Sequence, residues 1–418
     1  MSDLDQQLRQ LFREKEAVVG PAPTPDLPLV EEEYPSATRL GRIRAPLQVA
    51  ALAAIVAVAV IGFHLVRSST PAGPTSTPPQ TWDDALGDVS PLTMPKTLSE
   101  LPVQTNLPAS VPDPSADLPS LLDDPPGRVP MTWYPAPASG CDVSGWATET
   151  IYFYGQDGQW RRLNMVDLGL PKSTWPGCAS NGPGSLSPDG KWWTVGAKGL
   201  FVLLDLETGD LVTKKSRMSW GGTWTQDSHQ VIKFGDRKGA ALWEVPGIYV
   251  RDMPGMEGPG SGPLSLPGGG FIASDPPAKG DDPDGSSITL RYYTPNYDLV
   301  RTRTVPAPPA YECSLEGVEG DRVGMLCLVE PSKPHMFYVL DEASWRVEAA
   351  LAVPPGASAI PAHWLNPDLW SLWDAEGVGM WQIDQGKVGS VLPLPDEVKS
   401  AKWYTFNQFG FAGDLVTD

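Results

Sequence analysis

Residues 186–209, LSPDGKWWTVGAKGLFVLLDLETG, contain the pattern that decides the fold. In the turn sequence SPDG, Pro188 restricts φ, Asp189 can accept a hydrogen bond from the nearby backbone, and Gly190 tolerates positive φ. Two apolar runs follow, and a second turn sequence, ETG, ends the stretch. Apolar and aromatic runs bounded by turn residues are typical of β-strands, so we predict a series of antiparallel strands here.

Strand pairs of this kind recur through residues 131–418. Successive hairpins begin at intervals of roughly 40 to 50 residues, the length of a four-stranded propeller blade. After the first, they occupy Ala240–Met253, Ser287–Val305, His335–Val353 and Gly377–Leu394. The sequence therefore predicts an all-β fold, a β-propeller with six four-stranded blades, or with seven if Met131–Trp146 contributes strands.

The two ends of this domain are complementary. The hairpin at Thr148–Leu168 has no ordinary strand pair before it, and the strand pair at Val398–Val416 has no hairpin after it. We expect the two to complete one blade, with Phe409–Leu415 pairing with Ile151–Tyr154, which closes the ring and removes exposed sheet edges. The predicted blades are 148–168 with 398–416, 182–214, 219–253, 263–306, 312–354 and 358–395.

The repeat at residues 186–209 resembles that of TolB-like and WD40-like bacterial β-propellers, in which an SPDGK turn precedes a strand and a hairpin. The resemblance implies a binding platform, with a ligand or partner at one face of the ring. The matching residues are turns and strands, so the resemblance transfers no site residues.

A single apolar segment precedes the domain. Ala45–Val66 contains no Asp, Glu, Lys or Arg and is long enough to cross a bilayer as one helix. Arginines at positions 39, 42 and 44 come before it, whereas only Arg67 follows closely. The positive-inside rule predicts an uncleaved signal-anchor in the cell membrane, with residues 1–44 cytoplasmic and the propeller outside. A cleaved signal peptide is the alternative, which the long preceding region disfavours.

Two polar segments flank the predicted span. In the cytoplasmic tail, one face of a short amphipathic helix carries Leu4, Leu8, Leu11 and Phe12, which could contact a cytoplasmic partner; a solvated turn is the alternative. The rest of the tail is predicted to be disordered. Residues 67–130 are rich in proline, and we expect a disordered linker, a stalk reaching on the order of 150–190 Å.

Charge and cysteine content restrict the function. Residues 67–418 hold 42 acidic and 25 basic side chains, which disfavours binding to nucleic acid. All four cysteines lie in this part, as expected for two disulfides in an oxidising compartment, with free buried thiols as the alternative. Cys313 and Cys327 are equidistant from Gly320 and should face each other across a hairpin, which leaves Cys141 to pair with Cys178.

No motif for catalysis, metal or cofactor binding emerges. The histidines at 229, 335 and 363 are far apart and lack the HExxH pattern, and Asp281–Gly285 lacks the downstream Glu of a calcium loop. The tryptophans are assigned to blade packing rather than to a ligand platform. We therefore expect a non-catalytic binding platform for an envelope or extracellular protein, peptide or glycan. It would also be a sensor if the cytoplasmic tail transmits the ligand-bound state of the propeller inward. The alternative is a propeller enzyme of lyase, glycosidase or lactonase type, with converging carboxylates in the central channel.

Overall fold

A computed structural model describes residues 79–103, 105–135, 150–170, 184–197, 200–215, 222–235, 239–245, 250–253, 263–267, 269–275, 287–308, 312–328, 334–355, 360–374, 377–394 and 409–416. These residues belong to one compact unit, Pro74–Asp418. The predicted membrane span and the cytoplasmic tail lie outside the described residues. None of the described helices is both long and apolar enough to span a bilayer.

The described residues form six sheets, of which five have four strands and one has five. Sheet 1 contains β25 (Phe409–Phe411), β2 (Met131–Trp133), β3 (Thr150–Tyr154) and β4 (Trp160–Asn164). Sheet 2 contains β5 (Ser185–Leu186), β6 (Trp192–Ala197), β7 (Leu200–Asp205) and β8 (Leu211–Lys215). Sheet 3 contains β9 (Gly222–Trp224), β10 (Gln230–Gly235), β11 (Gly239–Glu244) and β12 (Val250–Met253).

The other three sheets follow in chain order. Sheet 4 contains β13 (Leu264–Ser265), β14 (Phe271–Asp275), β15 (Ser287–Tyr293) and β16 (Leu299–Pro306). Sheet 5 contains β17 (Glu312–Glu319), β18 (Arg322–Leu328), β19 (His335–Asp341) and β20 (Val347–Val353), with β1 (Leu92–Thr93) added beside β20. Sheet 6 contains β21 (Ile360–Asn366), β22 (Leu369–Asp374), β23 (Gly377–Gln382) and β24 (Lys387–Pro393). The short helices are α3 (Trp82–Leu86), η1 (Met165–Leu168) and α5 (Gly413–Val416).

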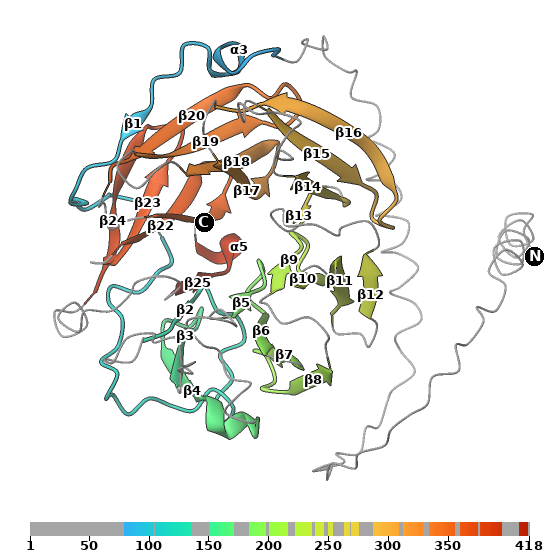
Figure 1. The fold of residues 1–418 in the computed structure, drawn as a ribbon. Coiled ribbons are helices and arrows are strands. Elements are labelled where there is room, and N and C mark those ends of the chain that lie inside the picture. Colours follow the sequence, from blue (N-terminus) through green and yellow to red (C-terminus); the bar gives the residue numbers. More distant parts are fainter. Residues whose placement is uncertain are drawn as a thin grey trace, which may run out of the picture. The chain divides into compact units, whose positions relative to one another are not determined.

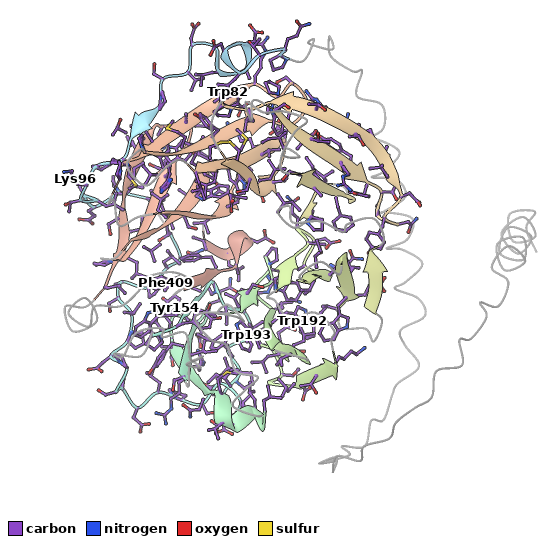
Figure 2. All side chains as sticks on the ribbon, in the orientation of Figure 1. Trp82, Lys96, Tyr154, Trp192, Trp193 and Phe409 are labelled. Atoms are coloured by element: carbon purple, nitrogen blue, oxygen red, sulfur yellow. A yellow bond between two sulfur atoms is a disulfide. The ribbon has the colours of Figure 1, made fainter. Side chains whose placement is uncertain are left out.

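The sheets are arranged around a common centre, and α5 lies near it (Figure 1). Within each sheet the four main strands are antiparallel neighbours, because turns such as Ser187–Gly190 reverse the chain. Buried apolar side chains fill the space between neighbouring sheets (Figure 2). The prediction of an all-β propeller is confirmed.

The ring closes differently from the prediction. Phe409–Phe411 pairs with β2, through Thr132 opposite Gly410, and β2 in turn pairs with β3. The expected direct pairing of Phe409–Leu415 with Ile151–Tyr154 is therefore wrong, and Gly413–Val416 is helical. A strand of three residues such as β2 is too short to show a periodic pattern. It joins the closing sheet rather than starting a seventh one.

The expectation of a free stalk is also wrong where the structure describes it. Residues 79–103 and 105–130, called the strap below, lie along the outer strands of sheets 5, 6 and 1. Leu92 pairs in parallel with Leu351 of β20, and isolated bridges join Glu100 to Ser390 and Ser120 to Arg162. Apolar side chains at intervals along the strap are buried: Trp82, Met94, Leu101, Val111 and Leu121. Proline favours the extended chain that fits a sheet edge, and these apolar residues supply the burial.

The tryptophans whose side chains the structure describes are buried or half-buried. Trp193 and Trp370 are fully enclosed, and Trp224 is 7% exposed. Between sheets 5 and 6 the ring of Trp370 lies 4.4 Å from that of Phe337 and faces Gly324 of β18. The absence of a side chain at Gly324 leaves the space that these rings occupy.

Candidate functional site

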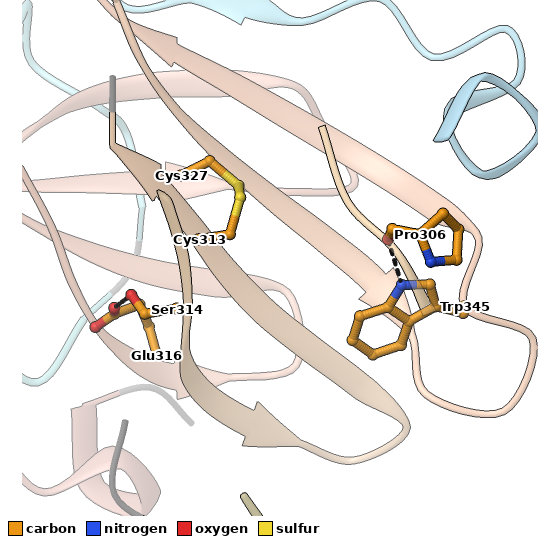
Figure 3. The surroundings of a disulfide bond; sticks show 6 residues. All are labelled: Pro306, Cys313, Ser314, Glu316, Cys327 and Trp345. Atoms are coloured by element: carbon orange, nitrogen blue, oxygen red, sulfur yellow. Dashed lines mark hydrogen bonds between the residues drawn. A yellow bond between two sulfur atoms is a disulfide. The ribbon is translucent and has the colours of Figure 1, made fainter. Parts of the chain in front are cut away.

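The predicted hairpin disulfide is present. Cys313 of β17 and Cys327 of β18 are directly opposite in the strand register and are joined by a disulfide (Figure 3). Both are buried, at 8% and 0% exposure, so this bond stabilises the hairpin from within. Cys141 and Cys178 lie outside the described residues, and their pairing stays a prediction.

The three histidines that lack a metal-binding pattern in the sequence belong to three different sheets. His229 is an exposed residue of the β9–β10 turn, whereas His335 begins β19, on a different sheet. His363 is part of β21, and Asp281–Gly285 lies outside the described residues. Within the described part of the chain, no group of three or more His, Cys, Asp or Glu residues could hold a metal ion.

Hydrogen bonds link α5, the β5–β6 turn, the β9–β10 turn and the end of β17 near the centre of the ring (Figure 1), and this region is called the mouth below. The amide of Asp414 in α5 donates to the carbonyl of Pro188 at 3.1 Å. The amide of Asp189 donates to Oγ of Ser228 at 3.0 Å, which links sheets 2 and 3. Nε2 of Gln226 donates to the carbonyl of Val318, which links sheet 3 to sheet 5. The innermost strand of sheet 4, β13, has only two residues. The hydrogen bond from Gln226 to Val318 therefore joins sheets 3 and 5 directly, without a contribution from sheet 4.

Three carboxylates of the mouth influence one another electrostatically, Asp189 acting on Asp414 and Asp414 on Glu319, and they are called the carboxylate row below. Burial, followed by the charge of Asp189, raises the pKa of Asp414, which Arg128 partly offsets. Burial, followed by the charge of Asp414, raises the pKa of Glu319. When these carboxylates are ionised, their negative charges repel one another. A positively charged group close to them would be attracted to them.

A fourth carboxyl, Glu316, belongs to β17, the strand of sheet 5 that lies toward the centre of the ring (Figure 1). Glu316 is the extra residue of a β-bulge in β17, since the register with β18 shifts between Leu315 and Gly317. The bulge places Glu316 beside Ser314, whose hydroxyl donates to the carboxylate, on the opposite side of the strand from the disulfide (Figure 3). Burial raises the pKa of the Glu316 carboxyl, and the bond from Ser314 opposes that rise.

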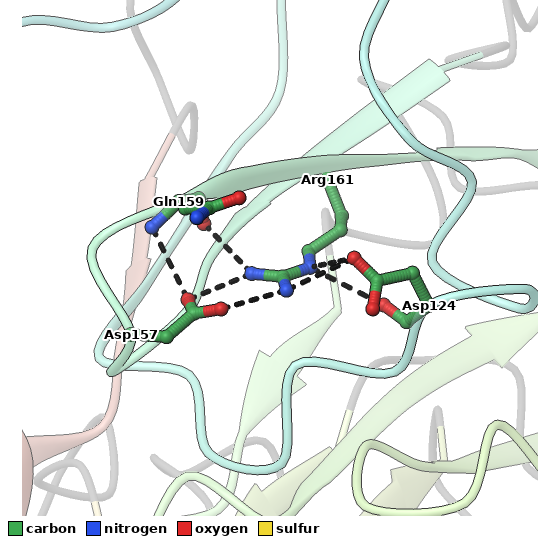
Figure 4. Close-up of polar contacts among 4 residues, drawn as sticks. All are labelled: Asp124, Asp157, Gln159 and Arg161. Atoms are coloured by element: carbon green, nitrogen blue, oxygen red, sulfur yellow. Dashed lines mark hydrogen bonds and ion pairs between the residues drawn. The ribbon is translucent and has the colours of Figure 1, made fainter.

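A second polar cluster has a structural role. Arg161 of β4 is 5% exposed and forms ion pairs with Asp124 of the strap at 3.0 Å and with Asp157 at 2.7 Å (Figure 4). The hydrogen bond from Arg161 is the main cause of the lowered pKa of Asp157. The guanidinium is thus saturated by the protein, and it fastens the strap to sheet 1.

A cavity of about 390 Å³ lies between the strap and β24. Its walls are mainly apolar, with Leu92, Leu101 and Val388, and the exposed side chains of Glu100 and Lys387 also line it. The cavity forms because the strap crosses from sheet 5 to sheet 6 between its hydrogen bonds to Ala352 and Ser390.

The sequence alone does not predict the three carboxylates of the mouth as a group. Asp189 is visible in the SPDG turn, where it accepts hydrogen bonds from Ser187 and the Lys191 amide. Glu319 and Asp414 are separated along the chain and meet only because the C-terminal segment returns to the ring. No local pattern could have identified that meeting.

Comparisons with known proteins give a fold and no family. No family model matches the chain, and no curated protein matches it. Among solved structures, Kuenenia stuttgartiensis hydrazine synthase is similar with a TM-score of 0.36 and 10% identity, over 66% of this chain and 81% of that one. The Myceliophteria thermophila Cps50 (Swd1) β-propeller domain is similar with a TM-score of 0.35 and 12% identity, over 62% of this chain and 88% of that one. These similarities identify no function. The assignment of a β-propeller rests on the six sheets of this chain.

Proposed function

We propose that this chain is a membrane-anchored binding protein whose propeller lies outside the cytoplasm and holds a cationic partner at the mouth, without catalysing a reaction. The observation that supports it is the row formed by Asp189, Asp414 and Glu319, in which the carboxylates repel one another. Arg128 acts on the row through Asp414, whose raised pKa it offsets only in part. A lysine or arginine side chain of a partner would supply the missing positive charge.

The chemistry of the mouth narrows the partner class. A basic segment of an envelope or extracellular protein, or a basic peptide, complements the carboxylates, whereas a neutral glycan does not. The net charge of −19 adds a long-range attraction for such a partner and raises its association rate at low salt.

The anchor is proposed from the apolar segment Ala45–Val66 and the arginines before it. Because the strap is packed from residue 79 onward, residues 67–78 alone separate the proposed span from the propeller. At about 3.3 Å per extended residue, this tether reaches about 40 Å, far less than the expected stalk. The propeller would thus act close to the bilayer.

Binding is tested with the full-length chain in detergent micelles and a fluorescent peptide of alternating Lys and Gly, with a Glu and Gly peptide as the control. We expect the basic peptide to bind with an affinity that falls as salt rises. The double variant Glu319→Gln, Asp414→Asn should bind it at least several-fold more weakly, whereas the exposed Asp123→Asn should bind as the wild type does. Equal binding by the two variants would refute the mouth as the site.

Topology is tested separately. In intact cells, external protease should remove the propeller while an epitope placed before residue 45 stays protected. A protected propeller would refute the proposed orientation, irrespective of what the mouth binds. If the chain is also a sensor, removal of residues 1–18 should abolish a cytoplasmic response to the partner.

A further inference from the structure

The outer strand of sheet 4, β16, has an uncovered edge. Within the part of the chain that the structure describes, β16 pairs only with β15, and it lies at the periphery of the ring (Figure 1). Its first four residues are exposed, and among them Leu299 and Val300 are 55% and 63% exposed. The register with β15 shifts at the start of the strand, but residues 301–306 pair regularly. An edge strand of eight residues with exposed apolar side chains can bind another extended chain through its backbone.

The other outer strands are less receptive to a further chain. The strap pairs with β20, β24 and β4, and its hydrogen bonds occupy part of each of these edges. Of the remaining two strands, β12 has only four residues, and β8 ends with Lys214 and Lys215, whose charges oppose strand addition. Among the outer strands, β16 thus combines the greatest length with an exposed apolar surface.

The contact between the strap and β4 shows how this fold binds an extended chain. The amide of Arg162 donates to the carbonyl of Pro119 at 2.9 Å, and the amide of Leu121 donates to the carbonyl of Arg162 at 2.8 Å. The strap is added in the parallel direction, and the side chain of Leu121 is fully buried. The carboxylate of Asp117 forms an ion pair with the guanidinium of Arg162 at 3.1 Å. Backbone pairing, an apolar anchor and an acidic side chain therefore act together at this edge.

The side chains of β16 resemble those of β4 in charge. The sequence of β16, LVRTRTVP, contains two arginines and no acidic residue, although the whole chain has a net charge of −19. The guanidinium of Arg301 is half-exposed and forms an ion pair with Glu342 at 3.1 Å. Nη1 of Arg303 donates to the backbone carbonyls of Glu342 and Ala343, at 3.3 and 3.1 Å, rather than to a carboxylate. Among the described residues, one carboxylate thus serves two guanidiniums, and an acidic partner would be attracted to this edge.

We propose that β16 is a docking site for an extended, acidic, proline-containing segment of a partner protein, which adds to sheet 4 as a further parallel strand. Such a segment would bind β16 as residues 117–124 of the strap, DLPSLLDD, bind β4. Its apolar residue would contact Leu299 and Val300, and its carboxylates would lie beside Arg301. Proline is compatible with this arrangement, because only alternate amides of an added edge strand need to donate to the sheet. The site is separate from the mouth and does not depend on the cationic partner proposed there.

The experiment measures binding of a fluorescent peptide, PSADLPSLLDD, to the full-length chain in detergent micelles, by anisotropy. This peptide is the sequence of residues 114–124, and a scrambled peptide of the same composition is the control. We expect saturable binding of the first peptide and much weaker binding of the second. Val300→Glu should weaken binding about fivefold or more, because it removes an apolar contact and adds a like charge. Val166→Glu is the matched variant and should bind as the wild type does, since Val166 is 65% exposed but follows β4 in η1.

Two further measurements locate the site. Arg301→Gln should weaken binding and reduce its dependence on salt, and it keeps the test valid if the first variant fails to fold. Hydrogen exchange should show that the peptide protects residues 299–306 and leaves residues 160–164 unchanged. Equal affinities of the two valine variants, equal binding of the scrambled peptide, or protection of residues 160–164 alone would overturn the proposal. A dimer that Val300→Glu abolishes, without any peptide binding, would assign the edge to a second copy of the chain and would also overturn it.

Discussion

The space that Gly324 leaves for two aromatic rings predicts a defined cost for adding one methyl group. A β-carbon at Gly324 would lie 2.8 Å from Cη2 and Cζ3 of Trp370 and 2.9 Å from Cζ of Phe337. These are ring atoms of fully buried side chains, so neither ring can swing into solvent. Overpacking of this kind costs about 1–3 kcal/mol. Alanine also restricts the unfolded chain, which offsets about 0.4–1 kcal/mol, so we expect Gly324→Ala to lower the free energy of unfolding by about 1–2 kcal/mol.

A double-mutant cycle isolates the cause. Trp370→Phe removes the ring atoms that the new methyl group would meet and should be destabilising alone, because it leaves a cavity between sheets 5 and 6. Combined with Gly324→Ala, the two losses should be less than additive, with a coupling of about 1 kcal/mol. The measurement is urea unfolding of the full-length chain in detergent micelles, followed by far-UV circular dichroism. If the two losses simply add, the rings do not determine the cost, and the packing argument is refuted.

Three further outcomes follow from buried groups. Leu121→Ala in the strap should lower the free energy of unfolding by about 2–5 kcal/mol in the same assay, because this side chain is fully buried. The exposed Asp123→Ala should change that free energy little, and equal effects of the two variants would contradict a packed strap. Replacing Cys313 and Cys327 together with serine should lower the free energy of unfolding by about 2–4 kcal/mol. A reductant should then cause no further loss of stability through that hairpin. Burial raises the pKa of Glu316, so its ionisation destabilises the fold as the pH rises through the folded-state value, and Glu316→Gln should flatten that part of the stability profile; a variant with the wild-type pH dependence would show that another group titrates there.

The sequence by itself determined the features that depend on near neighbours. The SPDG turn and the apolar runs after it specify antiparallel strands, since turn geometry and strand burial act over a few residues. The disulfide between Cys313 and Cys327 could be predicted for the same reason, because both lie in one hairpin at equal distances from its turn.

Only the tertiary structure decided which strands close the ring, where the strap lies and which carboxylates meet. The short strand Met131–Trp133 carries no periodic pattern, and its partner Phe409–Phe411 is far away in the chain. Proline-rich composition disfavours an independent core, but it does not prevent Leu101 or Leu121 from packing on surfaces that other residues build. The meeting of Glu319 with Asp414 likewise depends on the return of the C-terminus to the ring. Contacts between distant segments depend on the finished shape, because their energies arise only once both surfaces have formed.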